Sequence, residues 1–363
     1  MQHKQIVFLC GARDYHAMDW YNSAKDILPS RKILVLTDLI EGEGFNKIVK
    51  EGDAIHKLLI LDKFLFKKQS SFGNLWRNLL KIICLPIQVV LLKKFARKFP
   101  ESIYHAHAMY YLFLAWAANI EYIGTPQGSD VLVRPYKSKL YKLFAIKALK
   151  SAKGITVDSV SMKNNIKKLS GVNSVIVQNG IDVKTILVQS PYHVIRDKVL
   201  SIRGFTDLYR INEIFQARKS ILKELEIHFI YPFHDDSYKE RIAKNFNKVD
   251  KDYGRVTRNE MYELLHSSKL VISIPKSDSS PRSVYEAIFC GCSVAVTYNP
   301  YLDILPKCMK ARIIVVDLDN ENWLKEAIKQ SEKITAIKYY PSEQAIKIFD
   351  QKESLKTISN LFY

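Results

Sequence analysis

The chain has 363 residues, of which 47% are hydrophobic and 25% are charged. This length suits two domains that each bury a core, and the composition excludes a disordered or fibrous protein. Its five cysteines are scattered and lack a CxxC pair, which argues against a disulfide framework and a structural zinc site. No secretory signal opens the sequence, so we expect a cytoplasmic protein.

The formal net charge of +18 is concentrated in the N-terminal half. Residues 1–200 carry +15 of this charge, and residues 201–363 carry only +3. Such a field attracts phosphorylated substrates, anionic lipid or nucleic acid, and charge alone does not choose among them.

Short apolar runs alternate with helical patterns through the N-terminal half, which is the order of a parallel, doubly wound sheet. We predict this half to be a first domain, residues 1–190. The runs predicted as strands are residues 5–10, 32–36, 57–61, 102–105, 121–124, 154–157 and 174–177.

Residues 63–100 form a basic and apolar stretch, with nine Lys or Arg and no Asp or Glu. Its longest nearly apolar run, residues 82–92, has 11 residues and contains Pro86, whereas crossing a bilayer takes about 20. Two interpretations of residues 63–98 remain open. They form either a pair of interfacial helices on an anionic inner membrane surface, or a core helix with a solvated basic edge.

The alternation restarts after residue 190 and predicts a second domain, residues 191–340. The boundary falls within residues 188–198. A last helical pattern at residues 342–361 predicts a C-terminal segment, residues 341–363, that packs back on the first domain. The predicted strands of the second domain are residues 199–203, 226–230, 270–274, 293–297 and 312–315, with a helix from about Tyr209.

The most informative segment is residues 277–287, which follows a predicted strand. Ser280 can cap a helix and Pro281 suits its first position. The start of such a helix offers backbone N–H groups and a positive dipole to a phosphate. Asp278 and Glu286 can each accept hydrogen bonds from the hydroxyls of a polyhydroxylated ligand. The alternative is that Asp278 caps a turn and Glu286 lies on the surface.

The Asp278-x7-Glu286 spacing resembles the EX7E segment of retaining GT-B glycosyltransferases, especially family four, with Asp in place of the commoner Glu. In the same order as in that family, residues 102–107 resemble the H-x-H strand end, residues 126–130 the HGSD loop with Gln127 replacing His, and residues 179–182 the NG(I/V)D turn. The resemblance implies an α/β fold with two Rossmann-like, doubly wound domains facing a central cleft (GT-B). It also implies transfer of a sugar from a nucleoside diphosphate sugar, with retention of configuration and without a metal or other cofactor.

The resemblance assigns Glu286 to the donor ribose and Asp278 to the transferred sugar. Arg203 resembles the family's diphosphate-binding cation, which is needed because negative charge builds on the leaving phosphate. Arg210 follows seven residues on, where a Lys is expected; the alternative is a helix-surface arginine. The other residues placed in the donor site are Ser279, Ser280, Pro281, Arg282 and Ser283.

The strand that ends near His107 is predicted to supply a third catalytic residue beside Asp278 and Arg203. We expect His105 and His107 to face opposite ways, so that at most one, His107, lies in the cleft and His105 is structural. The remaining predicted acceptor-side residues are His16, Asp19, Gly128, Ser129, Asp130 and Asn179. Each of these also has a local interpretation as a turn or a solvated loop residue.

We therefore predict a transferase that acts on a lipid-linked or saccharide acceptor in bacterial surface polysaccharide synthesis, peripheral to the inner face of the cytoplasmic membrane. The alternatives are a GT-B sugar-nucleotide epimerase and a non-catalytic nucleotide- or nucleic-acid-binding module. No nucleic-acid-binding motif is present, so nucleic acid is not the expected partner. The sequence does not identify the base or the sugar of the donor.

Overall fold

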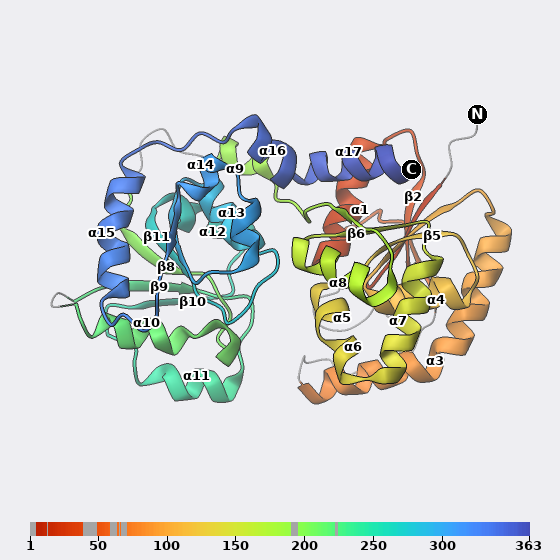
Figure 1. The fold of residues 1–363 in the computed structure, drawn as a ribbon, viewed down its shortest axis with the longest axis horizontal. Helices are drawn as coiled ribbons and strands as arrows, with labels where there is room; N and C mark the ends of the chain where they lie inside the picture. Colours follow the sequence, from red (N-terminus) through yellow and green to blue (C-terminus); the bar gives the residue numbers. More distant parts are fainter. Residues whose placement is uncertain are drawn as a thin grey trace. The chain divides into compact units, whose positions relative to one another are not determined.

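The computed structural model describes residues 5–12, 14–38, 49–58, 64, 66, 71–189, 195–221 and 224–363. The chain divides into two compact units (Figure 1). Unit 1 comprises Met1–Asn179 and Gln351–Tyr363, and unit 2 comprises Gly180–Asp350. Each unit is built on one parallel sheet, so the predicted α/β class with two doubly wound sheets is confirmed.

The sheet of unit 1 has seven described strands in the order β3-β2-β1-β4-β5-β6-β7. β1 lies between β2 and β4, with Ile6 opposite both Ile33 and Ile103. The third strand lies earlier than predicted, and residues 59–61 of that prediction are outside the described residues. The strands are β1 (Ile6–Leu9), β2 (Ile33–Thr37), β3 (Ile55–Lys57), β4 (Ile103–His107), β5 (Tyr122–Thr125), β6 (Gly154–Val157) and β7 (Val175–Ile176).

Helices cover both faces of this sheet, because side chains alternate along each strand. Val7 and Leu9 pack in one cluster with α3, α4, α7 and α8, whereas Ile6 and Phe8 pack in another with α1 and α17. The described helices of unit 1 are α1 (Tyr15–Ile27), α3 (Ser71–Lys98), α4 (Met109–Ala117), α5 (Gly128–Leu132), α6 (Arg134–Lys137), α7 (Lys139–Ser151), α8 (Val160–Ser170) and α17 (Gln351–Phe362).

The described part of the basic stretch forms one long helix, α3, whereas one of the two interpretations expected a pair of helices. The helix continues through Pro86, whose exposed position limits the effect of the missing backbone N–H. Among the described residues, none of the helices combines the length and the apolar character needed to cross a bilayer.

The sheet of unit 2 has six described strands in the order β10-β9-β8-β11-β12-β13. The sequence does not predict β10, an edge strand with the polar sequence KDYG whose one partner among the described strands is β9. The strands are β8 (Lys198–Ser201), β9 (Ile227–Ile230), β10 (Lys251–Gly254), β11 (Ser268–Ser273), β12 (Ser293–Val296) and β13 (Ile313–Val315).

Unit 2 also buries both faces of its sheet. Val271 and Val294 pack with residues of α9, α12 and α13, and Leu270 and Ile272 pack with residues of α10, α11 and α15. The helices are α9 (Val183–Val188), η2 (Asp207–Tyr209), α10 (Ile211–Arg218), α11 (Asp236–Ala243), α12 (Arg258–His266), α13 (Arg282–Phe289), η3 (Pro300–Ile304), α14 (Lys307–Lys310), α15 (Trp323–Thr335) and α16 (Glu343–Phe349).

The C-terminal helical pattern is two helices that belong to different units. Asp350 separates them with an extended backbone, so α16 ends in unit 2 and α17 packs against α1 in unit 1. The predicted domain boundary at residue 190 lies outside the described residues, and α9, which precedes it, packs against α13 in unit 2.

Candidate functional site

The order of strands in unit 2 changes direction between β8 and β11. From β8 the chain builds outward through β9 to β10, and from β11 it builds the other way to β13. In doubly wound sheets, ligands bind at the carboxyl ends of the strands at this switch point. Arg203 follows β8 and Asp278 follows β11, so the topology brings both predicted residues to this point.

Arg203 is held in a defined geometry there. Its Nη2 donates to Asp278 Oδ2 at 2.7 Å, and its Nε donates to Ser273 Oγ at 2.7 Å. The side chains of Arg203 and Asp278 are only 11% and 18% exposed. The guanidinium carbon also lies 5.5 Å from the centroid of the Tyr209 ring, a cation–π distance. A fixed cation therefore lies beside a carboxylate at the switch point.

Helix α13 places Glu286 in the interior of unit 2. The helix begins at Arg282, and Pro281 occupies the position before it, one residue later than predicted. Glu286 is 6% exposed, which contradicts the alternative that it lies on the surface. The Tyr262 hydroxyl donates to Glu286 Oε1 at 3.3 Å, and burial together with this carboxylate raises the pKa of Tyr262.

The loop before α13 is anchored at its start. The backbone N–H of Asp278 donates to Asn299 Oδ1 at 3.0 Å, so the loops that follow β11 and β12 are connected. Four of the predicted donor-site residues in this segment are half-buried and Pro281 is buried. The four are Ser279, Ser280, Arg282 and Ser283.

Arg210 lies at the same edge and faces inward, so the interpretation as a helix-surface arginine is wrong. Its backbone has φ 52°, between η2 and α10. Its Nε donates to the Ile274 carbonyl at 2.9 Å, and its Nη2 donates to the Pro275 carbonyl at 2.7 Å and Thr297 Oγ1 at 3.2 Å. Burial lowers the pKa of Arg210. Because these contacts occupy donors, Arg210 fixes the loop after β11.

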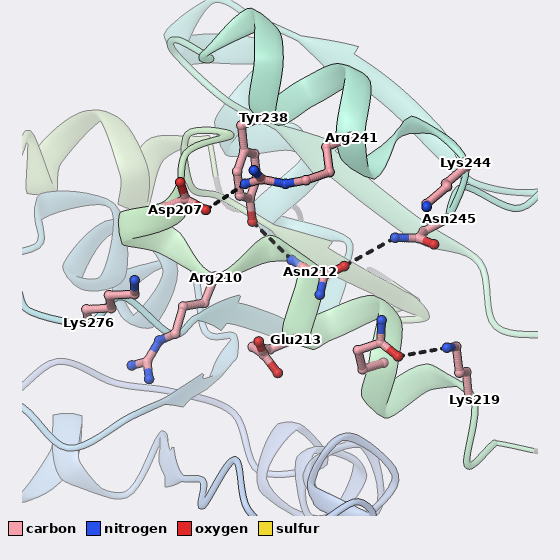
Figure 2. A pocket seen from close by; sticks show the side chains of 11 residues that line it. Asp207, Arg210, Asn212, Glu213, Lys219, Tyr238, Arg241, Lys244, Asn245 and Lys276 are labelled. Carbon is pink, nitrogen blue, oxygen red and sulfur yellow. Dashed lines mark hydrogen bonds and ion pairs between the residues drawn. The ribbon is translucent and has the colours of Figure 1, made fainter.

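A polar cavity of about 540 Å³ lies next to this edge, between η2, α10 and α11. Figure 2 shows Arg210 and Lys276 at one side of it, and the Asp207–Arg241 ion pair of 2.7 Å across from them. The cavity contains neither Asp278 nor Glu286. We therefore place the candidate site at the switch point, where charged side chains are held against one another, and regard the cavity as its neighbour.

Unit 1 has its own switch point, between β1 and β4. His107 is the last residue of β4. Gln127, which follows β5, donates from Nε2 to Asp14 Oδ2 at 3.0 Å, and Asp14 Oδ1 accepts from the backbone N–H of His16 at 3.0 Å. The loops after β1 and β5 are thus joined beside His107.

The expectation that His105 and His107 face opposite ways is wrong. Residues two apart on a strand project to the same face, and the two ring centroids are 4.3 Å apart. His105 bonds to the Tyr363 hydroxyl at 2.6 Å and to Thr125 Oγ1 at 2.7 Å, which is a structural role. His107 Nε2 is buried without a hydrogen-bond partner among the described residues. Burial, and then the charge of His16, lower the pKa of His107 to about 3.

The backbone next to His107 is strained. Ala108 has φ 66° and ψ 149°, a region that costs a residue with a side chain about 1–3 kcal/mol. Asp130 holds this turn: its Oδ2 accepts from the N–H groups of Met109 at 2.8 Å and Gln127 at 3.1 Å, and its Oδ1 pairs with Arg134 at 3.0 Å. Asp130 therefore positions the loop.

The other predicted acceptor-side residues lie near the same edge on separate elements. Gly128 and Ser129 open α5 directly after β5. His16 is exposed and Asp19 is half-buried on α1. Asn179 donates from Nδ2 to Asp158 Oδ2 at 3.3 Å, after β6.

Sequence reasoning missed several residues that hold these sites together. Four of them lie at or after the carboxyl end of a strand, which is the signal that could have found them. Tyr262 lies on a helix and carries no such signal. The four are Asp14, Ser273, Tyr209 and Asn299.

Comparisons with known proteins give a fold. No protein-family model matches the sequence, and no curated protein sequence matches it. Among solved structures, the chain is similar to sucrose-phosphate synthase from Thermosynechococcus elongatus, with a TM-score of 0.72, 10% identity, and coverage of 99% of this chain and 98% of that one. It is similar to Anabaena HepE in complex with UDP and glucose, with a TM-score of 0.68, 13% identity and 99% coverage of both chains.

A third similar structure is S. aureus TarM in complex with fondaparinux, alpha-GlcNAc-glycerol and UDP. Its TM-score is 0.68 at 11% identity, and the match covers 99% of this chain and 100% of that chain. Likeness at such low identity shows the fold alone. The chain has the GT-B fold of two Rossmann-like units.

Proposed function

We propose that the protein is a glycosyltransferase that takes its sugar from a nucleoside diphosphate sugar bound to unit 2. The observation that carries the proposal is the arrangement at the switch point, where Arg203 is fixed beside Asp278. Asp278 lies in the loop directly before α13, the helix that carries buried Glu286. UDP in similar structures of the same fold supports the class of donor.

The charges at this edge suit the chemistry of the leaving group. Breaking the bond between the anomeric carbon and the diphosphate moves negative charge onto the phosphate, and Arg203 with the N–H groups at the start of α13 can stabilise it. Glu286 accepts hydrogen bonds from the ribose, and Asp278 from the transferred sugar. In this proposal Arg203 supplies the positive charge, and no divalent metal takes part.

We propose retention of configuration, with front-face attack of the acceptor hydroxyl. The acceptor oxygen forms the new bond to the anomeric carbon as the bond to the diphosphate breaks, and the leaving phosphate takes the hydroxyl proton. His107 is neutral at physiological pH because its pKa is about 3, so it serves as a hydrogen-bonding partner in unit 1 and not as a cation.

The proposed acceptor is a lipid-linked or saccharide hydroxyl in bacterial surface polysaccharide synthesis, reached from the cytoplasmic side of the membrane. The excess positive charge of residues 1–200 supports a phosphorylated acceptor carrier. We place the acceptor on unit 1, near His107, His16 and Asp19.

A thermal-shift panel of UDP-, GDP-, TDP- and ADP-sugars tests the donor class. A ligand present at 100 times its dissociation constant stabilises the folded protein by about 2.7 kcal/mol, which raises the melting temperature by several degrees. Glu286→Ala should remove this shift, and Glu321→Ala, an exposed residue of unit 2, should keep it.

Transfer is then measured with the stabilising donor, with and without acceptor. Full transfer activity of Glu286→Ala would overturn the proposed site. Interconversion of sugar epimers in the absence of an acceptor would identify an epimerase instead.

A further inference from the structure

We propose that the outer surface of four neighbouring helices of unit 1 docks on an anionic lipid bilayer. This docking face consists of residues 72–98 of α3, 110–116 of α4, and 133–150 on and beside α6 and α7. The inference extends the proposed function, because an acceptor on a lipid carrier would be presented at such a bilayer.

The outer side of α3 is an apolar stripe. A helix at a protein surface is normally polar on its outer side. On α3, exposed apolar residues instead recur at intervals of three and four, the spacing of one helix face, over about 27 Å. These residues, 46% to 66% exposed, are Phe72, Leu75, Leu79, Ile82, Ile83, Ile87 and Val90.

The stripe cannot turn inward, because the opposite side of α3 is already fixed in the core. Leu80 and Leu92 are buried there. Lys81 pairs with buried Asp38 at 2.7 Å, and the Tyr110 hydroxyl of α4 donates to the Lys81 carbonyl at 3.1 Å. The helix therefore has both a core side and an exposed apolar side, which the two interpretations of residues 63–98 had treated as alternatives.

Helices α4 and α7 continue the surface on the same side of the sheet (Figure 1). Phe113 and Trp116 of α4 are half-buried, and their ring centroids lie 6.5 Å and 5.9 Å from that of Phe144 on α7. Exposed apolar residues follow on and beside α6 and α7. These are Val133, Tyr136, Leu140, Leu143 and Phe144, which are 36% to 63% exposed.

The charge on this face has one sign. Residues 71–98 and 131–151 contain no Asp or Glu. Cations near a membrane surface each attract anionic headgroups by about 1 kcal/mol. Lys81 does not belong to this face, because it pairs with Asp38 on the core side of α3. The other cations of these segments are Arg77, Lys93, Lys94, Arg97 and Lys98 on α3, and Arg134, Lys137, Lys139, Lys142, Lys147 and Lys150 on α6 and α7.

This combination fits a lipid surface better than a macromolecule. Protein interfaces are depleted in Lys, which is abundant here. Single-stranded nucleic acid stacks its bases on aromatic rings, whereas most exposed apolar residues of α3 are aliphatic. Helices that lie in the plane of a membrane interface combine Lys and Arg with Leu, Phe and Trp, as this face does.

Vesicle flotation of the full chain tests the proposal, with phosphatidylcholine alone or mixed with phosphatidylglycerol. A charge variant replaces three lysines of α3, and its matched control replaces three exposed lysines of α15 in unit 2. The charge variant is Lys93→Gln with Lys94→Gln and Lys98→Gln, and the control is Lys325→Gln with Lys329→Gln and Lys333→Gln.

An apolar variant separates insertion from charge attraction alone. It combines Ile83→Ser and Leu143→Ser, and its control combines Val188→Ser and Ile337→Ser. All four side chains are exposed, by 49% to 76%. The substitutions should therefore leave the melting temperature unchanged.

We expect the protein to float with the phosphatidylglycerol vesicles and not with phosphatidylcholine alone. The charge variant should lose roughly 10- to 100-fold in partitioning, the apolar variant should also lose binding, and both controls should float like the unmodified chain. Absence of flotation, equal flotation with both vesicle types, or unchanged flotation of both variants would overturn the docking face.

Two further measurements separate this inference from the proposed function and from a protein partner. Nucleotide-sugar binding without vesicles reports on unit 2 alone, so a protein that binds donor but no vesicles refutes only the docking face. Self-association in analytical ultracentrifugation that Ile83→Ser with Leu143→Ser abolishes, without vesicle binding, would instead assign the face to a second copy of the chain.

Discussion

The Asp278 carboxylate and the diphosphate of the proposed donor compete for the same guanidinium, that of Arg203. If the diphosphate binds Arg203, it shares the guanidinium with a carboxylate that already lies 2.7 Å from Nη2. We predict that Asp278→Asn, which keeps the shape of the side chain and removes its charge, binds nucleoside diphosphate more tightly than the unmodified protein and transfers sugar more slowly.

The expected magnitude follows from the geometry. A phosphate on the other side of the guanidinium would lie roughly 6 Å from the Asp278 carboxylate, where Coulomb's law at a dielectric constant of about 20 gives about 3 kcal/mol of repulsion. The Asp278 side chain is 18% exposed, so solvent and salt screen part of this energy. A net gain of about 1 kcal/mol corresponds to roughly fivefold tighter binding.

Isothermal titration calorimetry with the nucleoside diphosphate selected by the thermal-shift panel measures this change. The gain should shrink at high salt. Asp197→Asn, which removes an exposed carboxylate at the amino end of β8, is the control and should leave the affinity unchanged. Equal or weaker binding by Asp278→Asn would refute the reasoning, because Arg203 would then not be the cation that meets the diphosphate.

Three other substitutions test the remaining features. Glu286→Gln should weaken nucleoside diphosphate binding about 10- to 100-fold in calorimetry, because hydrogen bonds to a charged group contribute about 1.5–3 kcal/mol; unchanged affinity would exclude a ribose contact. His107 stays neutral when folded, with a pKa of about 3, so its contribution to stability is complete above pH 6.5 and is lost as the pH falls from 6.5 towards 3. Between pH 8 and pH 5, the free energy of unfolding in urea should therefore fall by about 2 kcal/mol less for His107→Leu than for the unmodified chain. An equal fall in both proteins would contradict a neutral buried imidazole. Lys81→Met removes the cation paired with buried Asp38 and should lower the free energy of unfolding in urea by about 3–5 kcal/mol. Adding Asp38→Asn should recover much of this loss. A loss below about 1 kcal/mol would show that the pair does not stabilise α3.

The strands could be predicted because most of them are short buried apolar runs. The run around β1 is buried at all four positions of the strand, and β12 is the same. The strand that was not predicted is β10, whose exposed, polar sequence reflects its place at the sheet edge and not an intrinsic pattern. Long-range pairing decides such a strand, so local sequence could not show it.

The candidate site could be predicted in its residues and not in its contacts. Arg203 and Asp278 are 75 positions apart in the sequence, and only the strand order brings them together. For His105 and His107 the period of a strand already indicated a shared face, and the expectation of opposite faces misapplied it. The exposed stripe of α3 was ambiguous because apolar residues lie on both sides of the helix, which the sequence does not sort into core and surface.

The division of the chain has a consequence for how the protein is made. Because α17 completes the helical layer over Ile6 and Phe8, unit 1 is interrupted by the whole of unit 2. On the ribosome, residues 180–350 emerge as one continuous stretch and can fold as soon as they are clear of the tunnel. The strands of unit 1 are synthesised before unit 2, and the side of their sheet that carries Ile6 and Phe8 stays incompletely covered until residues 351–363 are synthesised. Chaperones therefore have the longest time to bind this exposed apolar side.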